Sequence, residues 1–396
     1  MSEKLPNKIL VVDNDLGVLN SLSKGLESYK INVIPAKNWE TALYQYNQQK
    51  LDLCLVSLEL EELAGTALIQ KWRNHEIQSK RHVAMILSTA QQRRATDTAL
   101  VKELGEIALI TKPIKIPNLL SLMVNAMKMS KSRESIYEIH NKVVLPLLNK
   151  NRIDKCLAIA QEKLEPLGSK GKFLSAQVHG EAGKVDYSLD ILKNLIEKDS
   201  LNMMYHNEIA KIYLKSGQFE KAKKSYELAD QAAPQNIDRL NEMARMYLKL
   251  KMPEQSIEKF TGILSLTPEQ QDIKYDMYDE ITKAGFLEHA QEFCKQTSTP
   301  KELVRFFNNK GVMHSKTSNY NEAIDEYQKA THLIPGSKEL YRVLYNMALA
   351  HINLKTKPNL EKAHELLLES LKLQGNFEKA REKLEMISKF INKNNS

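Results

Sequence analysis

Polar side chains that could do chemistry follow the apolar runs in the first third of the sequence. They are Asp13, Asn14, Asp15, Ser57, Thr89 and Lys112. Carboxylates can hold a divalent cation, whereas a hydroxyl becomes a good nucleophile only when a base activates it. No histidine is placed to activate Ser57, and the ten histidines do not cluster. These residue types therefore allow ion binding but do not predict catalysis.

The elements that must position these side chains alternate along the chain up to about residue 129. Short β-branched runs cover residues 8–13, 31–36, 51–58, 82–89 and 107–112. Amphipathic stretches cover residues 16–28, 39–49, 65–78 and 93–104, and another begins at 116. Five strands alternating with five helices predict an α/β doubly wound parallel sheet. Sites in such sheets form at the carboxyl ends of the strands, where the polar side chains lie.

Residues 6–129 resemble the response-regulator receiver domain. The first strand ends in Val-Val-Asp13-Asn14-Asp15, where the family has an acidic pair, and Ser57 stands where the family has its phosphorylated aspartate. The fourth strand ends in Ser-Thr89-Ala, and the fifth ends in Lys112-Pro, where the family has an invariant lysine and a cis-proline. The resemblance implies a receiver-like, flavodoxin-like sheet of five parallel strands.

Departures from the family pattern predict a receiver that has lost its chemistry. Serine replaces the phosphoacceptor at Ser57, and an amide replaces the second acidic residue at Asn14. Of three expected carboxylates only Asp13 remains, so the set is too weak to hold Mg²⁺. Glu61 replaces the usual proline, and Leu109 replaces the aromatic switch residue. We therefore expect a pseudo-receiver with no metal and no cofactor.

Several acidic residues near this site have two interpretations. Asp15 could replace a lost metal ligand, but an aspartate before an apolar helical stretch more often caps the helix. Glu59, Glu61 and Glu62 could supply metal oxygens or could form a solvated loop. Lys112, without its usual carboxylate partner, is expected to pair with Asp13.

From about residue 134 the strand pattern ends and a helical period of 34 residues begins. Ala176, Ala210 and Ala244 are 34 residues apart, each with an aromatic residue or histidine three positions later. The clearest unit covers residues 203–235, whereas 135–168, 271–302 and 340–374 keep fewer markers. The markers of the next unit are Ala244, Tyr247, Ser256, Phe260, Ile263 and Pro268, and those of a later one are Gly311, His314, Ala323, Tyr327, Ala330 and Pro335. In these units small residues alternate with aromatic or large apolar residues, and a proline ends the unit. This pattern resembles the tetratricopeptide repeat. The resemblance implies a solenoid of about seven helical hairpins over residues 130–392, with a capping helix near 376–392.

The first helix of each tetratricopeptide hairpin lines a groove in that family. Carried onto this chain, the groove positions hold Asn207, Lys211, Asn241, Arg245, Arg305 and Asn308. Amides can bind the backbone of an extended peptide, and the cations favour carboxylates. The alternative is that these residues are ordinary polar surface of amphipathic helices.

Composition sets the limits on function. Apolar residues make up 42% of the 396 residues and charged residues 27%, which predicts folded domains. No apolar run is long enough for a membrane helix and no signal peptide is recognisable, so a cytoplasmic protein is expected. Three separated cysteines suit buried thiols. The net charge of +8 comes from 57 basic and 49 acidic residues that are intermixed, so nucleic-acid binding is not favoured.

Together these features predict a non-catalytic signalling adaptor that binds protein partners through its solenoid and its receiver-like surface. Two alternatives remain: a phosphorylation-responsive regulator with a non-standard acceptor, and a nucleic-acid-associated regulator. The oligomeric state stays open, with a dimer among the options.

Overall fold

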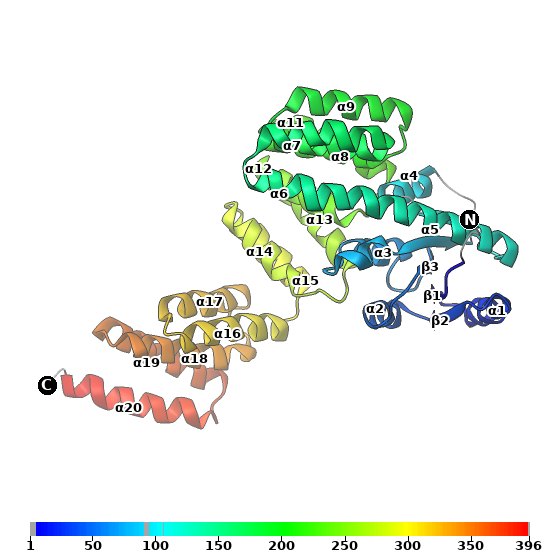
Figure 1. The fold of residues 1–396 in the computed structure, drawn as a ribbon. Coiled ribbons are helices and arrows are strands. Elements are labelled where there is room, and N and C mark those ends of the chain that lie inside the picture. Colours follow the sequence, from blue (N-terminus) through cyan, green and yellow to red (C-terminus); the bar gives the residue numbers. More distant parts are fainter. Residues whose placement is uncertain (1–4, 91–94, 106, 395–396) are drawn as a thin grey trace. The chain divides into compact units, whose positions relative to one another are not determined.

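The computed structural model describes residues 5–90, 95–105 and 107–394 (Figure 1). The chain forms two compact units, Met1–Ile273 and Lys274–Ser396. The first contains the sheet and the first part of the helical region, and the second contains only helices. Among the residues described, every helix is too short or too polar to cross a bilayer.

The predicted five-stranded parallel sheet is confirmed, with the strand order β2-β1-β3-β4-β5. Its strands are β1 Lys8–Val12, β2 Asn32–Ala36, β3 Leu53–Ser57, β4 Ala84–Thr89 and β5 Ala108–Thr111. Its helices are α1 Leu16–Glu27, α2 Trp39–Gln48, α3 Gly65–Arg73, α4 Ala95–Glu103 and α5 Ile116–Ile139. The start of the expected helix at 93–104 lies outside the described residues. Strands β3 and β4 are buried along their whole length because helices cover both faces of the sheet.

Helix α5 joins the sheet to the helical region without a break. Residues 128–135, between the expected receiver-like segment and the start of the helical period, lie inside α5. After α5 come a π-helical turn at His140–Val144, α6 Leu145–Asn149, α7 Ile153–Ile159 and a second π-helical turn at Ala160–Leu164. The weakly marked segment 135–168 is therefore built from short, irregular helical pieces.

Regular helical hairpins follow from residue 168. In the first unit the helices are α8 Gly168–Glu181, α9 Val185–Lys198, α10 Met203–Lys215, α11 Phe219–Ala232, α12 Ile237–Lys249 and α13 Pro253–Leu266. Next come α14 Ile273–Lys283, α15 Leu287–Thr297, α16 Pro300–Lys316, α17 Tyr320–Leu333, α18 Tyr341–Leu354, α19 Lys357–Leu373 and α20 Glu378–Asn394. The predicted run of helices after the sheet is confirmed.

Small residues allow the paired helices to pack closely. Ala210 and Ala222 are fully buried and pack with Tyr226. In the second unit, a Cβ added at Gly311 would lie 2.3 Å from the Tyr327 ring, so only glycine fits there. The three cysteines are free and buried, as expected. The repeat markers therefore identify the core of the hairpins.

Candidate functional site

The predicted receiver residues meet at the carboxyl edge of the sheet because of the strand register. Val12 pairs with Val56, so the following residues, Asp13 and Ser57, lie side by side. Thr89 pairs with Thr111, the residue before Lys112. The fold therefore brings side chains from four strands to one edge.

Lys112 is the centre of this pocket. Its Nζ lies 2.7 Å from Asp13 Oδ2 and donates to Ser57 Oγ at 2.9 Å. Ser57 is fully buried and its hydroxyl donates to the Glu59 carbonyl at 3.3 Å. The expected ion pair between Lys112 and Asp13 is present. The one carboxylate left from the acidic set is thus already neutralised by a cation.

Asn14 and Asp15 hold the loops around the pocket. Asp15 caps α1 by accepting from the Gly17 N–H at 2.7 Å, which confirms the capping interpretation. Asn14 accepts from the Glu61 N–H at 3.0 Å and donates to the Lys37 carbonyl at 3.2 Å. Both residues therefore have structural roles in the loops.

The acidic loop after β3 is more ordered than a freely solvated loop. The Glu59 carboxylate accepts from the Thr89 hydroxyl at 2.5 Å and from the Ala90 N–H at 3.3 Å. Glu62 accepts from the Trp39 indole at 3.2 Å. Within residues 5–90, 95–105 and 107–394, no group of three or more His, Cys, Asp or Glu side chains has the arrangement of a metal site. Glu59 is thus the carboxylate that holds Thr89.

Backbone features of the pocket follow the receiver pattern. The Lys112-Pro113 peptide bond is cis. A Cβ added at Gly65 would lie 2.0 Å from the Ser57 carbonyl oxygen, so this close approach of β3 and α3 requires glycine. Leu109 is buried, at the position of the family's switch aromatic. The cis peptide bond and the close approach at Gly65 therefore retain the receiver scaffold around Ser57 and Lys112.

The predicted groove residues are divided between the two units and make different contacts. The side chain of Asn207 on α10 donates to Glu103 of α4 and accepts from Arg239 of α12 at 3.3 Å. Lys211 and Asn241 are partly buried, and Arg245 is exposed. Asn308 belongs to the second unit, where its amide oxygen accepts from Asn346 at 2.8 Å. Asn207 is thus engaged by the sheet domain of its own chain.

Sequence reasoning missed Glu103 and Arg239, which form a buried ion pair. Both side chains are almost completely inaccessible, at 1% and 0% exposure. Arg239 also donates to Asp230 at 3.3 Å and to the Ala233 carbonyl. Burial raises the pKa of Glu103, and Arg239 and Asn207 partly offset that rise. Burying two charges costs free energy of desolvation. Removing one member of the pair costs more, because the other charge is left buried without its partner.

Helix α3 makes a second set of contacts with the hairpins of the first unit. The Gln70 amide donates to the Gln235 carbonyl at 2.9 Å and accepts from the Ile237 N–H at 2.8 Å. Next to it, Lys71 forms an ion pair with Glu269. We use the name junction for one set of contacts. In it, Gln70, Lys71 and Glu103 contact helices α10–α13 and the loops that flank these helices.

The second unit contains an open cavity of about 450 Å³ at the start of α16 and α18. We call it the C-terminal cavity. It is lined by Thr299, Lys301, Glu302, Val304, Arg305, Asn308, Asn309, Glu339, Tyr341 and Arg342. Arg342 stacks over the Tyr341 ring at 5.3 Å and donates to its hydroxyl at 2.7 Å. Two predicted groove residues, Arg305 and Asn308, therefore line one cavity.

Comparison with known proteins divides the chain at the same places. Residues 9–124 match the response regulator receiver domain, and residues 205–236 and 304–336 match the tetratricopeptide repeat. The chain is similar to a receiver domain protein from Methanospirillum hungatei JF-1, with 22% identity and a TM-score of 0.29 over 32% of this chain and 98% of that one.

Two curated relatives are similar to parts of the chain. The transcriptional regulatory protein GlrR of Escherichia coli (strain K12) is 27% identical over 130 residues, 33% of this chain and 28% of that protein. The BBSome complex member BBS4 of Bos taurus is 24% identical over 178 residues, 43% of this chain and 32% of that protein. The matches thus span about a third of these relatives. The chain carries a response regulator receiver domain followed by tetratricopeptide repeats, a combination that fits a signalling protein with protein-interaction repeats.

Proposed function

We propose that this protein is a non-catalytic signalling adaptor whose receiver domain does not accept a phosphoryl group and whose solenoid binds an acidic segment of a partner protein. The observation that carries the first part is the Lys112 ammonium between Asp13 and Ser57. Phosphoryl transfer in a receiver needs a carboxylate nucleophile and a bound divalent cation. Here a buried hydroxyl occupies the first position, and a lysine neutralises the carboxylate that remains for the second.

Incubation with acetyl phosphate and Mg²⁺ tests this part directly. Intact-mass spectrometry of the full chain should show no added phosphoryl group. A double variant, Ser57→Asp with Asn14→Asp, restores the missing carboxylates and serves as the positive control. A mass gain in the unmodified protein that disappears in Ser57→Ala would overturn the proposal and favour the phosphorylation-responsive alternative.

The second part is supported by the way the chain holds its own Glu103. An asparagine in the repeat, Asn207, and an arginine, Arg239, bind this carboxylate together. Asn308 stands at the same repeat position as Asn207, three residues before the small core residue. It lines the C-terminal cavity with Arg305 and Arg342. An amide beside two guanidinium groups can hold a carboxylate of an extended peptide.

Affinity capture from the protein's own cells tests the cavity. We expect Arg305→Ala with Asn308→Ala to lose the partner that the unmodified chain retains. The matched control is Asn353→Ala with Lys379→Ala, which also removes one asparagine and one cation, on other helices of the second unit. Circular dichroism should show equal helicity in both double variants. Retention of the partner by the cavity variant would place the binding site elsewhere.

A further inference from the structure

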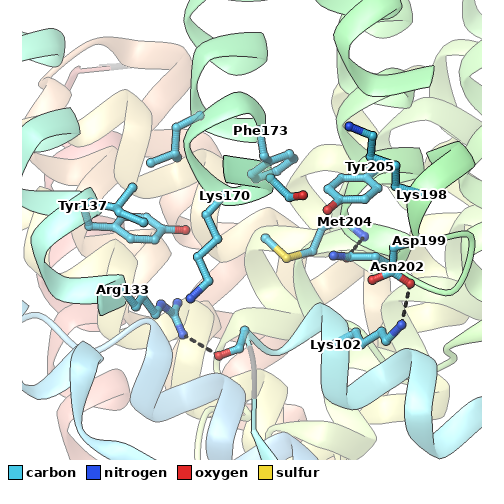
Figure 2. Close-up of a pocket in the computed structure, with 14 residues that line it drawn as sticks. Lys102, Arg133, Tyr137, Lys170, Phe173, Lys198, Asp199, Asn202, Met204 and Tyr205 are labelled. Atoms are coloured by element: carbon cyan, nitrogen blue, oxygen red, sulfur yellow. Dashed lines mark hydrogen bonds and ion pairs between the residues drawn. The ribbon is translucent and has the colours of Figure 1, made fainter. Parts of the chain in front are cut away.

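A second cavity lies inside the first unit, between the receiver domain and the first regular hairpins. Its volume is about 370 Å³, within the range of small-molecule sites. Lys102 and Gly105 line it from α4 and the turn that follows, and Arg133 and Tyr137 line it from α5. The starts of α8 and α10 close the other side (Figure 2). We call this space the bridging cavity.

Charged side chains of the bridging cavity make contacts within the chain. Lys102 forms an ion pair with Asp199, the one carboxylate among the described wall residues. The Arg133 guanidinium donates to the Gly105 carbonyl at 3.4 Å and lies over the Tyr137 ring at 5.3 Å. These cations are therefore already occupied by groups of the protein itself.

The two other lysines of the wall do not form a joint site for an anion. Lys170 has an interaction partner of its own, and in Figure 2 Lys198 extends away from Lys170. An ion that entered would lose hydration without gaining a matching charge. The bridging cavity therefore favours a ligand without net charge.

Apolar and aromatic side chains form the rest of the described wall. They are Ile136, Tyr137, Phe173, Leu174, Met204 and Tyr205. Figure 2 shows the Tyr137 ring on one side of the cavity and the Phe173, Met204 and Tyr205 side chains on the other. The Phe173 and Tyr205 ring centroids are 5.7 Å apart, with the rings tilted by 50°. Aromatic rings and a thioether make favourable contacts with the faces and edges of a flat aromatic ligand.

The volume and the polar groups of the bridging cavity narrow the class of ligand. An apolar cavity of about 150 Å³ can hold one benzene ring. At about 370 Å³, the bridging cavity has room for a molecule of two rings. The Asn202 oxygen caps α10 by accepting from the Met204 N–H at 3.3 Å, and its amide nitrogen carries two donors. The Tyr137 hydroxyl can donate or accept.

We propose that the bridging cavity binds an uncharged aromatic molecule of two rings that carries one hydrogen-bonding group. The rings would pack between Tyr137 and the pair of Phe173 and Tyr205, with the polar group near Asn202 or the Tyr137 hydroxyl. Since the walls come from both the receiver domain and the hairpins, a bound ligand contacts both and stabilises their association. Ligand binding would then supply an input to the receiver domain that needs no phosphoryl transfer.

A matched pair of fluorescent dyes tests the class of the ligand. N-phenyl-1-naphthylamine is uncharged, and 8-anilino-1-naphthalenesulfonate has the same rings with an added sulfonate. Each dye is kept dilute while the concentration of the full chain is raised, and the increase in dye fluorescence gives the affinity. The uncharged dye should bind saturably with a Kd of about 100 µM or below. The sulfonate should bind about tenfold more weakly, because the cavity offers its charge no partner.

Two substitutions test whether the dye lies in the bridging cavity. Met204→Lys places a charge in the wall and should weaken binding of the uncharged dye about tenfold. Ser169→Phe places a ring in the space itself and should also weaken binding. Ser169 is exposed, so this change tests the cavity without disturbing the core. Circular dichroism should show that both variants keep the helicity of the unmodified protein.

Matched controls separate the bridging cavity from exposed apolar surface. Met386→Lys on α20 and Ser135→Phe on α5 change exposed residues that do not line the cavity, and they should leave dye affinity unchanged. Absence of saturable binding by the uncharged dye would overturn the proposal. Equal or tighter binding of the sulfonate would also overturn it, as would unchanged binding in Ser169→Phe or an equal loss in Met386→Lys.

Discussion

The two units use the same position of the tetratricopeptide repeat in different ways. Asn207 in the first unit binds Glu103 of the chain's own receiver domain, whereas Asn308 in the second unit lines an open cavity. Both stand three residues before the small residue of their hairpin. The repeat position therefore provides a polar group in both units, which binds Glu103 in the first and accepts from Asn346 at the wall of a cavity in the second.

Burial separates the two cases further. At the junction, the Glu103 and Arg239 side chains are inaccessible to solvent, so each depends on the other. In the C-terminal cavity, Arg305 is exposed and solvated. A buried ion pair is destabilised strongly by loss of one partner, whereas an exposed cation contributes little to stability. The comparison teaches that stability effects should concentrate at the junction and binding effects in the cavity.

The largest expected effect comes from Arg239→Met. This change leaves the Glu103 carboxylate buried without its cation, which costs about 3–5 kcal/mol of unfolding free energy. Denaturant unfolding followed by tryptophan fluorescence measures it, because Trp39 and Trp72 both lie in the receiver domain.

The matched variant is Arg305→Met, which removes an exposed guanidinium in the second unit. It should change the unfolding free energy by no more than about 0.5 kcal/mol. Adding Glu103→Met to Arg239→Met should recover most of the loss, because an apolar pair replaces the lone charge. Equal effects of the two arginine variants would show that the junction and the cavity do not differ in burial.

Much of the fold could be predicted because its signals are local. Alternating β-branched runs fixed the five strands, and the register then brought Asp13, Ser57 and Lys112 together without further information. The 34-residue period identified the small residues that the hairpins bury. Patterns that repeat along the chain report the packing of neighbouring elements, so they are readable from sequence.

The junction could not be predicted, because its partners are far apart in sequence. Glu103 and Arg239 are 136 residues apart, and each stands in an amphipathic helix where charge is normally solvated. Gln70 is 165 residues from Gln235. Which polar residues become buried depends on how the receiver domain docks on the hairpins, and no local period encodes that docking. Asn207 was predicted to line a groove, but its binding partner, Glu103, was not predicted.

Acidification should destabilise the first unit through His82, whose ring lies 5.6 Å from the Tyr137 ring of α5. Burial lowers the pKa of His82 from its usual 6.5 to about 4, and Arg133, Arg73 and Arg81 contribute to the shift while Glu138 opposes it. Between these values the unfolded chain binds a proton that the folded chain excludes, so stability falls as the pH decreases. From His82 alone, the loss at pH 4.5 relative to pH 7 should be about 2 kcal/mol.

The comparison with His82→Gln isolates this histidine. Glu103 titrates in the opposite sense, because its raised pKa favours the folded state as the pH falls. Tryptophan fluorescence should show a smaller pH dependence in His82→Gln than in the unmodified protein. An identical pH dependence in the two proteins would exclude His82 as an acid-sensitive group of the first unit.

Gln70→Ala tests the hydrogen bonds of the junction. Its amide satisfies the Gln235 carbonyl and the Ile237 N–H, so its removal should cost about 1–2 kcal/mol. Asn308→Ala is the counterpart in the C-terminal cavity and should leave unfolding nearly unchanged while it reduces partner capture. A Gln70→Ala protein as stable as the unmodified one would mean that water replaces both bonds.

The smallest effect is expected for Lys71→Ala, which removes the ion pair with Glu269. The Lys71 and Glu269 side chains are 11% and 24% exposed, compared with 0% and 1% for Arg239 and Glu103. Water screens a pair at this level of exposure, so the loss should be about 0.2–1 kcal/mol and should shrink at high salt. Denaturant unfolding at low and high ionic strength measures the loss of unfolding free energy and its dependence on salt. A loss above about 2 kcal/mol that persisted in salt would show that burial at the junction extends from α4 to α3.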